Sequence, residues 1–280
     1  MIHCNGLIAL LLLGVAPEKV VLERVGRLGH PAIREASGLT ASRRHPGIFW
    51  THNDSGNPSA LFAVRRDGTL VREYRVRVPN VDWEDIATDD AGHLFIGDIG
   101  NNDGRLPLRA IYQIEEPDPL VEEATDLKVT TASYYRFGES KRFDAEGLVV
   151  EKGQALVVGK SFDGRDAEVY SIPLDPPATL LKPAKARKVG TLPGFVWPAT
   201  GASLSATSGR LAVCGLKAAA IYRREKGLGW ELVWRGEFES RDQIEAVAWE
   251  GEDLILAGEG RGIFRIKEAT WKHKVLNNGK

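Results

Sequence analysis

The feature that most constrains the fold is a unit of short apolar strands that returns five times along the chain. Each unit has an apolar strand, a turn, a second apolar strand, a polar loop and a third strand, as in WEDIATDD, GHLFIGDIGNND and RAIYQIEEP. Matching positions are separated by 47, 62, 56 and 43 residues, at Leu39, Ile86, Leu148, Leu204 and Val247. Units of this length with several short strands are typical of a β-propeller, in which each unit forms one blade.

A further strand precedes each unit, at Val20–Leu28, Leu70–Val78, Leu127–Phe137, Lys188–Leu192 and Trp230–Phe238. The last unit therefore needs its outer strand from elsewhere, and we predict that Val20–Leu28 closes the ring by pairing with the fifth blade, which would cover exposed edges. Three alternatives stay open. Trp271–Asn277 supplies that strand, the 62-residue interval holds an irregular sixth blade, or the strands form a β-sandwich. The expectation is an all-β, five-bladed propeller.

Residues 1–16 differ from the rest of the chain. Gly6–Ala16 (GLIALLLLGVA) is apolar, too short to span a bilayer as a helix, and ends in small residues just before Pro17. This layout is that of a secretory signal peptide, without the usual positive start. We expect a leader over 1–16, one propeller domain over 17–280 and a secreted or periplasmic protein. The alternative is a buried N-terminal helix or strand.

The composition narrows the class of protein. Hydrophobic residues make up 43% of the chain, which indicates a globular fold. The 37 basic and 38 acidic residues leave a net charge of -1, so no global field favours nucleic acid or an anionic membrane. We expect a monomer that binds no nucleic acid and does not insert into a membrane after leader removal. Cys4 lies in the leader, and Cys214 lies in an apolar run typical of a core.

Acidic residues occupy equivalent positions in several units. In an antiparallel blade the first strand starts where the second ends, so residues at those two points gather at one end of the channel. Two positions before the matching apolar residue stand Ser37, Glu84, Glu146, Ala202 and Glu245. Asp82 and Asp144 come two residues earlier still, where they could also cap loops, and the second strands end at Asn53, Asp98 and Lys160. Glutamates that converge on one axis need a cation or a shared proton.

The available ligand types favour a hard ion. Oxygen donors without a Cys or His cluster suit Ca²⁺, with Mg²⁺ as the alternative, rather than zinc. His52, in HNDSG, is the one histidine near the predicted channel mouth, and it is either catalytic or a hydrogen-bonded structural residue. Arg105 and Lys160 lie beside the acids and are able to hold an anionic group.

The runs EASGLTASRRHPGIFWTHNDSG, WEDIATDDAGHLFIGDIGNN and FDAEGLVV with LVVGKS resemble exported bacterial propellers of the esterase-like-activity-of-phytase type, and more distantly calcium-bound lactonase-type propellers. The likeness covers roughly Glu35 to Ile266 and is weakest in the fourth unit, where Ala202 replaces an acidic residue. The resemblance implies a metal at the channel mouth and ester or phosphoester hydrolysis. It carries over to Asn53, Asp54, Glu84, Asp98, Glu146, Lys160 and Glu245.

Two functional hypotheses follow. The first is a metal-assisted hydrolase of an anionic ester, lactone or phosphoester. Its ion is held by Glu84, Glu146, Glu245, Asn53 and Asp98, and its catalytic groups are Glu146, Lys160, Arg105 and His52. The second is a binding module with a structural cation that recognises a small anionic ligand or a component of the cell envelope. It accounts for the absence of a GxSxG motif and of a recognisable Ser-His-Asp set.

Overall fold

The structure is a computed structural model that describes residues 17–121, 125–138, 143–162, 164–224 and 229–277. Its strands and helix, in chain order, are β1 (Glu18–Lys19), β2 (Glu23–Arg27), β3 (Ala36–Ala41), β4 (Ile48–Asn53), β5 (Ala60–Arg65), β6 (Leu70–Val76), β7 (Trp83–Thr88), β8 (His93–Asp98), β9 (Arg109–Glu115), β10 (Asp126–Leu127), β11 (Thr131–Arg136), β12 (Ala145–Glu151), β13 (Gln154–Gly159), β14 (Ala167–Pro173), β15 (Ala184–Lys185), β16 (Arg187–Leu192), β17 (Gly201–Leu204), β18 (Leu211–Gly215), β19 (Ala218–Arg224), β20 (Trp230–Glu237), β21 (Ile244–Glu250), β22 (Asp253–Gly258), β23 (Gly262–Ile266) and α1 (Glu268–Asn277).

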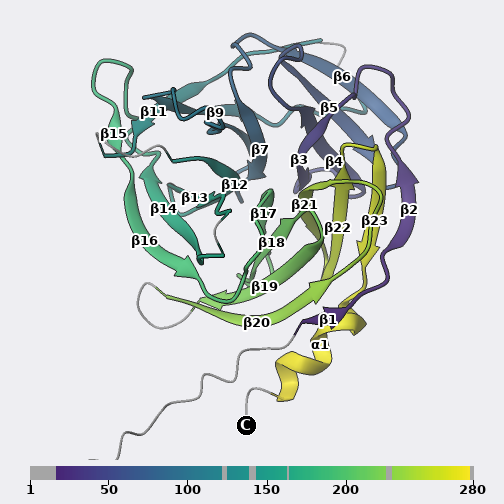
Figure 1. The fold of residues 1–280 in the computed structure, drawn as a ribbon. Helices are drawn as coiled ribbons and strands as arrows, with labels where there is room; N and C mark the ends of the chain where they lie inside the picture. The colour runs from purple at the N-terminus through teal and green to yellow at the C-terminus, as the bar shows by residue number, and fades with distance from the viewer. Residues whose placement is uncertain (1–16, 122–124, 139–142, 163, 225–228, 278–280) are drawn as a thin grey trace, which may run out of the picture.

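These strands form five sheets arranged as the blades of a β-propeller (Figure 1). The innermost strands are β3, β7, β12, β17 and β21, and each contacts the innermost strands of the two adjacent blades. The next strands along the chain lie progressively further from the centre. The predicted five-bladed, all-β propeller is therefore confirmed, and the β-sandwich alternative is wrong.

The N-terminal strand closes the ring. β2 pairs antiparallel with β23 and forms the outer edge of the fifth blade, so the predicted closure by Val20–Leu28 is confirmed. The alternative strand at Trp271–Asn277 is wrong, because this segment belongs to helix α1. The Asp253 carboxylate accepts the backbone N–H of Glu268 at the start of α1, and Trp271 packs edge-on against Trp249.

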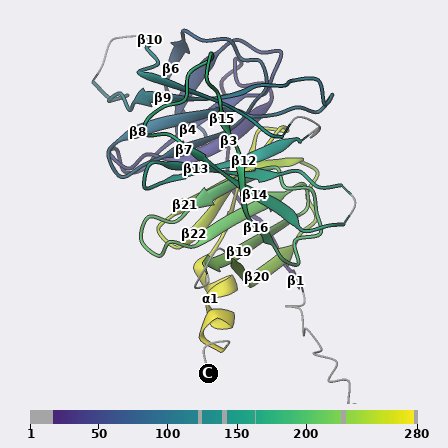
Figure 2. The same cartoon turned by 90° about the vertical axis from the view of Figure 1, so that its left-hand side faces the viewer.

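The long intervals between units do not form a sixth blade. β10 lies in the longest of them and pairs in parallel with β6 of the first blade (Figure 2). β15 adds to the second blade in the same way, and β1 adds to the fourth. The alternative of six blades is therefore wrong. The extra residues extend the outer edges of existing blades, which leaves fewer unpaired strand edges.

The hydrophobic core is divided among the five interfaces between adjacent blades. The interface between the first and second blades, for example, holds Trp50, Tyr74 and Trp83, all fully buried. Cys214 is a free, buried thiol in the interface between the fourth and fifth blades. Among the described residues, no helix combines the length and the apolar character needed to cross a bilayer. The predicted leader, residues 1–16, lies outside the described residues.

Candidate metal centre

Irregular strand pairing places two glutamates at one end of the channel. The register between β7 and β8 shifts between Trp83 and Asp85, which leaves Glu84 as the extra residue. Glu146 is the extra residue of the same irregularity between β12 and β13. A β-bulge bends its strand and redirects the side chain of the added residue. Both glutamate side chains are only 3% exposed, although each carries a carboxylate.

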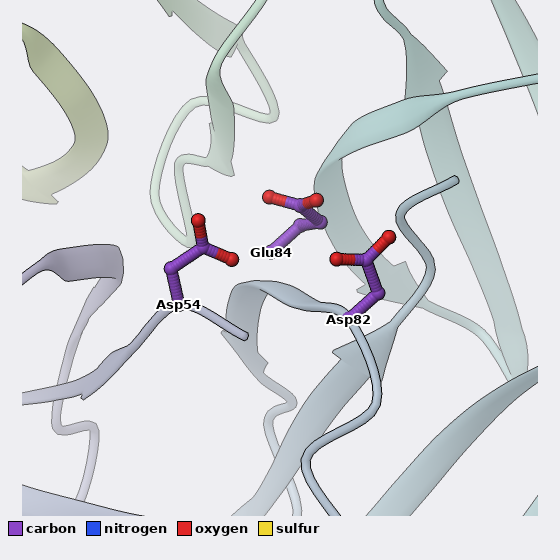
Figure 3. Close-up of side chains that lie close together, drawn as sticks. All are labelled: Asp54, Asp82 and Glu84. Atoms are coloured by element: carbon purple, nitrogen blue, oxygen red, sulfur yellow. The ribbon is translucent and has the colours of Figure 1, made fainter. Parts of the chain in front are cut away.

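Three aspartates complete an acidic cluster around these glutamates. Asp54 directly follows β4, while Asp82 and Asp144 directly precede β7 and β12. Ligand oxygens of Asp54, Asp82 and Glu84 lie within 4.8 Å of one another, and Figure 3 shows these carboxylates gathered around a common space. Glu84, Asp144 and Glu146 form a second trio of the same kind. We call these five residues the acidic cluster; Glu84 belongs to both trios.

Backbone contacts hold the aspartates of the cluster in place. The backbone N–H of Asp82 donates to Asp98 Oδ1 at 2.8 Å, and the backbone N–H of Asn101 donates to Asp144 Oδ1 at 2.7 Å. The chain passes close to the cluster at Gly100, where a Cβ atom would lie 2.1 Å from Glu84 Oε1 and 2.6 Å from Asp82 Oδ2. Only glycine leaves this space free for the carboxylates.

The buried glutamates of the cluster have raised pKa values. Burial, followed by the negative charges of Glu146, Asp54 and Asp82, raises the pKa of Glu84 well above its ordinary value. Burial raises the pKa of Glu146 to about 7, although the Lys160 charge opposes this shift. Among the described residues, Glu84 Oε1 is buried without a hydrogen-bond partner. Such a buried carboxylate oxygen needs either a proton or a cation.

Lys160 supplies the one positive charge seen in direct contact with the cluster in the described structure. Its Nζ lies 2.6 Å from Glu146 Oε1, and its side chain is 17% exposed. Burial by itself lowers the pKa of Lys160, but the negative charges of Glu146, Glu84 and Asp144 outweigh burial and raise it. Lys160 is therefore charged at neutral pH, and one ammonium faces five carboxyl groups.

The cluster fits a hard divalent cation. Both trios offer carboxylate oxygens alone, which are the ligands that Ca²⁺ and Mg²⁺ prefer, and neither contains the Cys or His typical of zinc. In each trio the three ligand oxygens lie close enough together for one ion to contact all of them. The buried oxygen without a partner among the described residues belongs to Glu84, the residue that both trios share.

Among the residues that the sequence singled out, the structure brings together Asp54, Glu84, Glu146 and Lys160. Glu245 stands beside this group rather than in it, since it belongs to neither trio. Burial raises the pKa of Glu245 to about 8, with the charges of Glu146 and Glu259 next in size. Of the three glutamates expected to meet, Glu84 and Glu146 therefore do so, and aspartates surround them.

Two of the expected metal ligands, Asn53 and Asp98, lie outside the acidic cluster and bind backbone groups near it. Asn53 Oδ1 accepts the backbone N–H groups of Arg34 and Glu35, and its Nδ2 donates to the Ala32 carbonyl. Its side-chain amide thus binds the loop before β3 rather than the acidic cluster. Asp98 positions Asp82 and accepts a hydrogen bond from the Tyr112 hydroxyl at 3.4 Å. Burial raises the pKa of Asp98 to about 6.

Two of the expected catalytic residues lie away from the cluster. His52 is fully buried, packs edge-on against Trp83 and contacts the Asn53 carbonyl through Nδ1. Burial lowers the pKa of His52 to about 4, so the ring is neutral at pH 7. The Arg105 side chain is 84% exposed and pairs with Asp103 on its own loop at 3.7 Å. Among the described residues, neither side chain forms a hydrogen bond or an ion pair with a member of the acidic cluster.

Sequence reasoning underrated several residues that build the site. The sequence allows Asp82 and Asp144 to cap loops, yet both belong to the cluster, and their equivalent positions in two units are the signal that indicates this. Asp85 is fully buried, and its carboxylate accepts the backbone N–H groups of Ile86, Leu148 and Ala202. Arg109 donates to the carbonyls of Ile99 and Phe143, next to Gly100 and Asp144. No local pattern marks these two roles.

Comparisons with known proteins support the architecture. No protein-family model matches the chain, and no curated protein matches it significantly. A glutaminyl cyclase from Myxococcus xanthus is similar in structure, with 13% identity, a TM-score of 0.56, and 90% of this chain and 98% of that chain covered. A virginiamycin B lyase from Staphylococcus aureus has 14% identity and a TM-score of 0.42, with 85% and 67% covered. A chain of a nidogen–laminin complex has 11% identity and a TM-score of 0.45, with 89% of each chain covered. At these identities the first likeness shows the fold alone.

Proposed function

We propose that the acidic cluster binds a divalent cation, Ca²⁺ first and Mg²⁺ second, and that the protein uses it to hydrolyse a small ester or lactone. The observation that carries the proposal is the buried Glu84 carboxylate, which two trios share and whose Oε1 has no partner among the described residues. The resemblance of the first three units to esterase-like propellers supports the choice of reaction.

A bound divalent cation would supply Lewis-acid chemistry, polarising the scissile carbonyl and lowering the pKa of a bound water. Lys160 offers an ammonium next to the cluster for the negative charge that develops on the substrate oxygen. Glu146, whose carboxylate lies next to the Lys160 ammonium, is placed to take a proton from the attacking water and to return it to the leaving group. The overall reaction consumes one water and yields an acid and an alcohol from an ester, or one hydroxy acid from a lactone.

The charges at the site restrict the charge that a substrate is expected to carry. Five carboxyl groups and one ammonium leave an excess of negative charge that a single divalent cation does not neutralise. A phosphate monoester would bring further negative charge to this place. An uncharged ester or lactone, or one with a single negative charge, is therefore a better fit than a phosphoester.

A chelation experiment tests the proposal. The purified protein is stripped with a chelator, analysed for metals and assayed with a panel of esters, lactones and phosphoesters before and after Ca²⁺ or Mg²⁺ is restored. We expect turnover of esters or lactones to disappear and to return with the cation. Turnover that survives stripping contradicts the proposal. Cation binding without turnover of any substrate points instead to a binding module with a structural ion.

We also propose that the protein is exported, because the apolar leader ends in small residues just before Pro17. Expression of the full chain in a bacterium that secretes proteins tests this. A mature protein in the periplasm or medium that starts at Pro17 supports export, whereas an intact N-terminus in the cytoplasm contradicts it.

A further inference from the structure

The connection between β14 and β15 carries two leucines that the fold does not bury. The backbone N–H of Lys182 donates to the Thr179 carbonyl at 3.1 Å and to the Thr179 hydroxyl at 3.2 Å, which closes a turn with Leu180 and Leu181 at its centre. Leu180 is 58% exposed and Leu181 is 93% exposed. Turns favour Gly, Pro, Asn, Asp or Ser, so neither the turn nor the core accounts for these two side chains.

Basic residues follow this turn and gather on one side of the blade edge. β15 pairs in parallel with β11, and the register places Lys185 opposite Arg136. Both side chains are exposed, as is Arg187 at the start of β16, whereas Ala186 between them is buried. In an extended chain, residues two apart point to the same side, so Lys185 and Arg187 both face outward. Like charges directly opposite each other on adjacent strands repel, so this arrangement favours a bound anion.

The charges of this region are not neutralised by neighbouring side chains of the described structure. Lys188 pairs with Glu168 at 2.8 Å, and Asp175 is the one acidic residue in the sequence from 174 to 188. No ion pair with another described residue is formed by the remaining basic residues, which are Lys182, Lys185, Arg187 and Arg136. The net charge of the chain is -1, so the positive charge here is a local excess. We call these four basic residues, together with Leu180 and Leu181, the rim patch.

The rim patch is separate from the acidic cluster. β13 ends at Gly159, beside Lys160, and β14 pairs antiparallel with β13, so β14 ends at Pro173 on the far side of the blade from the cluster. The connection that carries the patch starts from this far side, and Figure 1 shows β15 at the outer edge of the propeller. A partner bound at the rim patch therefore leaves the acidic cluster free to bind its own ligand.

We propose that the rim patch docks the protein on the surface of an anionic lipid bilayer. Leu180 and Leu181 enter the headgroup region, and the four basic residues contact the lipid phosphates. Apolar side chains and a basic cluster together supply the two signals that stable peripheral binding requires. A soluble polyanion would match the charges, but it would not account for the two exposed leucines. The protein lies on the bilayer without spanning it, whichever reaction the acidic cluster performs.

Flotation with lipid vesicles tests this proposal in the presence of EDTA, which removes any cation from the acidic cluster. We expect the protein to bind phosphatidylcholine vesicles that contain about one third phosphatidylglycerol, and to bind poorly to phosphatidylcholine alone. Lys185→Gln combined with Arg187→Gln should lower the partition coefficient about 30-fold, the effect of two basic side chains at an anionic surface. Leu180→Ser combined with Leu181→Ser leaves the charge unchanged and should lower it at least about tenfold. All four positions are exposed, and an unchanged Tm shows that the variants are folded.

Matched controls remove the same kinds of side chain elsewhere. Lys19→Gln combined with Arg34→Gln removes two exposed charges, and Val21→Ser removes a side chain that is 92% exposed. Both controls should bind vesicles as the wild-type protein does. Residues 1–16 are the same in every variant, so the leader contributes equally to all measurements.

The other outcomes overturn the proposal. Binding that the two serine substitutions leave intact assigns the basic residues to a soluble polyanion instead of a bilayer. Equal losses in the patch variants and in the controls show a non-specific charge effect. Equal binding to neutral and anionic vesicles, or no binding unless calcium replaces EDTA, also excludes docking by the rim patch.

Discussion

The fourth blade differs from the second and third in the two features that build the site. β17 pairs with β18 without a register shift from Gly201 to Leu204, and it carries Ala202 where the other two blades have glutamate. β7 and β12 each contain an irregularity, and the extra residue is Glu84 in one and Glu146 in the other. Regular pairing thus goes with an apolar position, and the bulged strands carry the buried carboxylates.

This difference shows that the blades share one architecture but do not all contribute residues to the acidic cluster. A bulge in the innermost strand changes the direction of a side chain while the rest of the blade keeps its pairing. The first blade has a bulge around Gly38 without a carboxylate, so a bulge alone does not make a site. The acidic cluster arises where bulges and acidic residues coincide in adjacent blades.

The largest effect is expected from Asp85→Asn, which weakens a fully buried side-chain link between the second blade and the third and fourth blades. Asp85 Oδ2 accepts the backbone N–H groups of Leu148 at 2.8 Å and Ala202 at 3.0 Å. An amide leaves at least one of the buried N–H donors of this group unsatisfied, at a cost of about 3 kcal/mol of unfolding free energy. Urea unfolding measures the loss. Asp126→Asn, at the surface, is the control, and an equal effect of both changes contradicts this role of Asp85.

Glu84→Gln tests whether the bulged glutamate shared by both trios dominates cation binding. We expect calcium affinity to fall about 100-fold, because the variant loses a charged ligand that both trios use. The cation-free protein should become more stable, because the change removes charge repulsion around Glu84. Calorimetric titration and thermal unfolding measure the two effects. Glu245→Gln, at a bulged glutamate outside both trios, should retain most of the affinity, and similar losses in both variants would falsify the assignment of the cluster.

Gly100→Ala sharpens the comparison by filling the space next to the cluster without changing any charge. The new methyl group would lie 2.1 Å from Glu84 Oε1 and 2.6 Å from Asp82 Oδ2, so the carboxylates must move apart. We expect calcium affinity to fall about tenfold, which corresponds to roughly 1.4 kcal/mol. Gly138→Ala is the matched control, since no atom of the described residues lies within 4 Å of its added Cβ. Unchanged affinity in Gly100→Ala places the ion elsewhere.

The pH dependence of the unfolding free energy tests the raised pKa values of the buried glutamates. The pKa of Glu146 is about 7 and that of Glu245 about 8 in the folded protein, against 4.5 as the ordinary value. The folded chain therefore holds protons that the unfolded chain releases, and this contribution is complete below pH 4.5 and lost as the pH rises to about 8. We expect each of the two groups to cost the cation-free protein up to about 1.4 kcal/mol per pH unit in this window.

Calcium should have the opposite pH profile, because it competes with protons for the same oxygens. Thermal unfolding between about pH 5 and pH 8, with and without excess calcium, measures both trends. A calcium-induced rise in Tm that grows with pH supports the cluster as the binding site. A rise that is the same at both ends of the range contradicts it.

Much of the fold was predictable from the chain because strand repeats are local patterns. The five matching positions identify the innermost strands, and the strand before the first unit has no partner except the open edge of the last blade. Glu84, Glu146 and Lys160 were predictable site residues because antiparallel pairing brings strand starts and strand ends to one face. Asn53 and Asp98 satisfied the same positional rule, and Arg105 lies on the loop that follows Asp98, but their side chains bind the backbone or their own loops instead.

By itself, the sequence determined the number of blades, the closure of the ring and the face on which the acids gather, since these depend on the spacing and alternation of apolar residues. Only the tertiary structure decided which acids meet. That outcome depends on bulges at Glu84 and Glu146, on the close passage of the chain at Gly100, and on the link from Asp85 to two other blades. These contacts join residues far apart in the chain, and side-chain direction at a bulge is set by packing rather than by local composition.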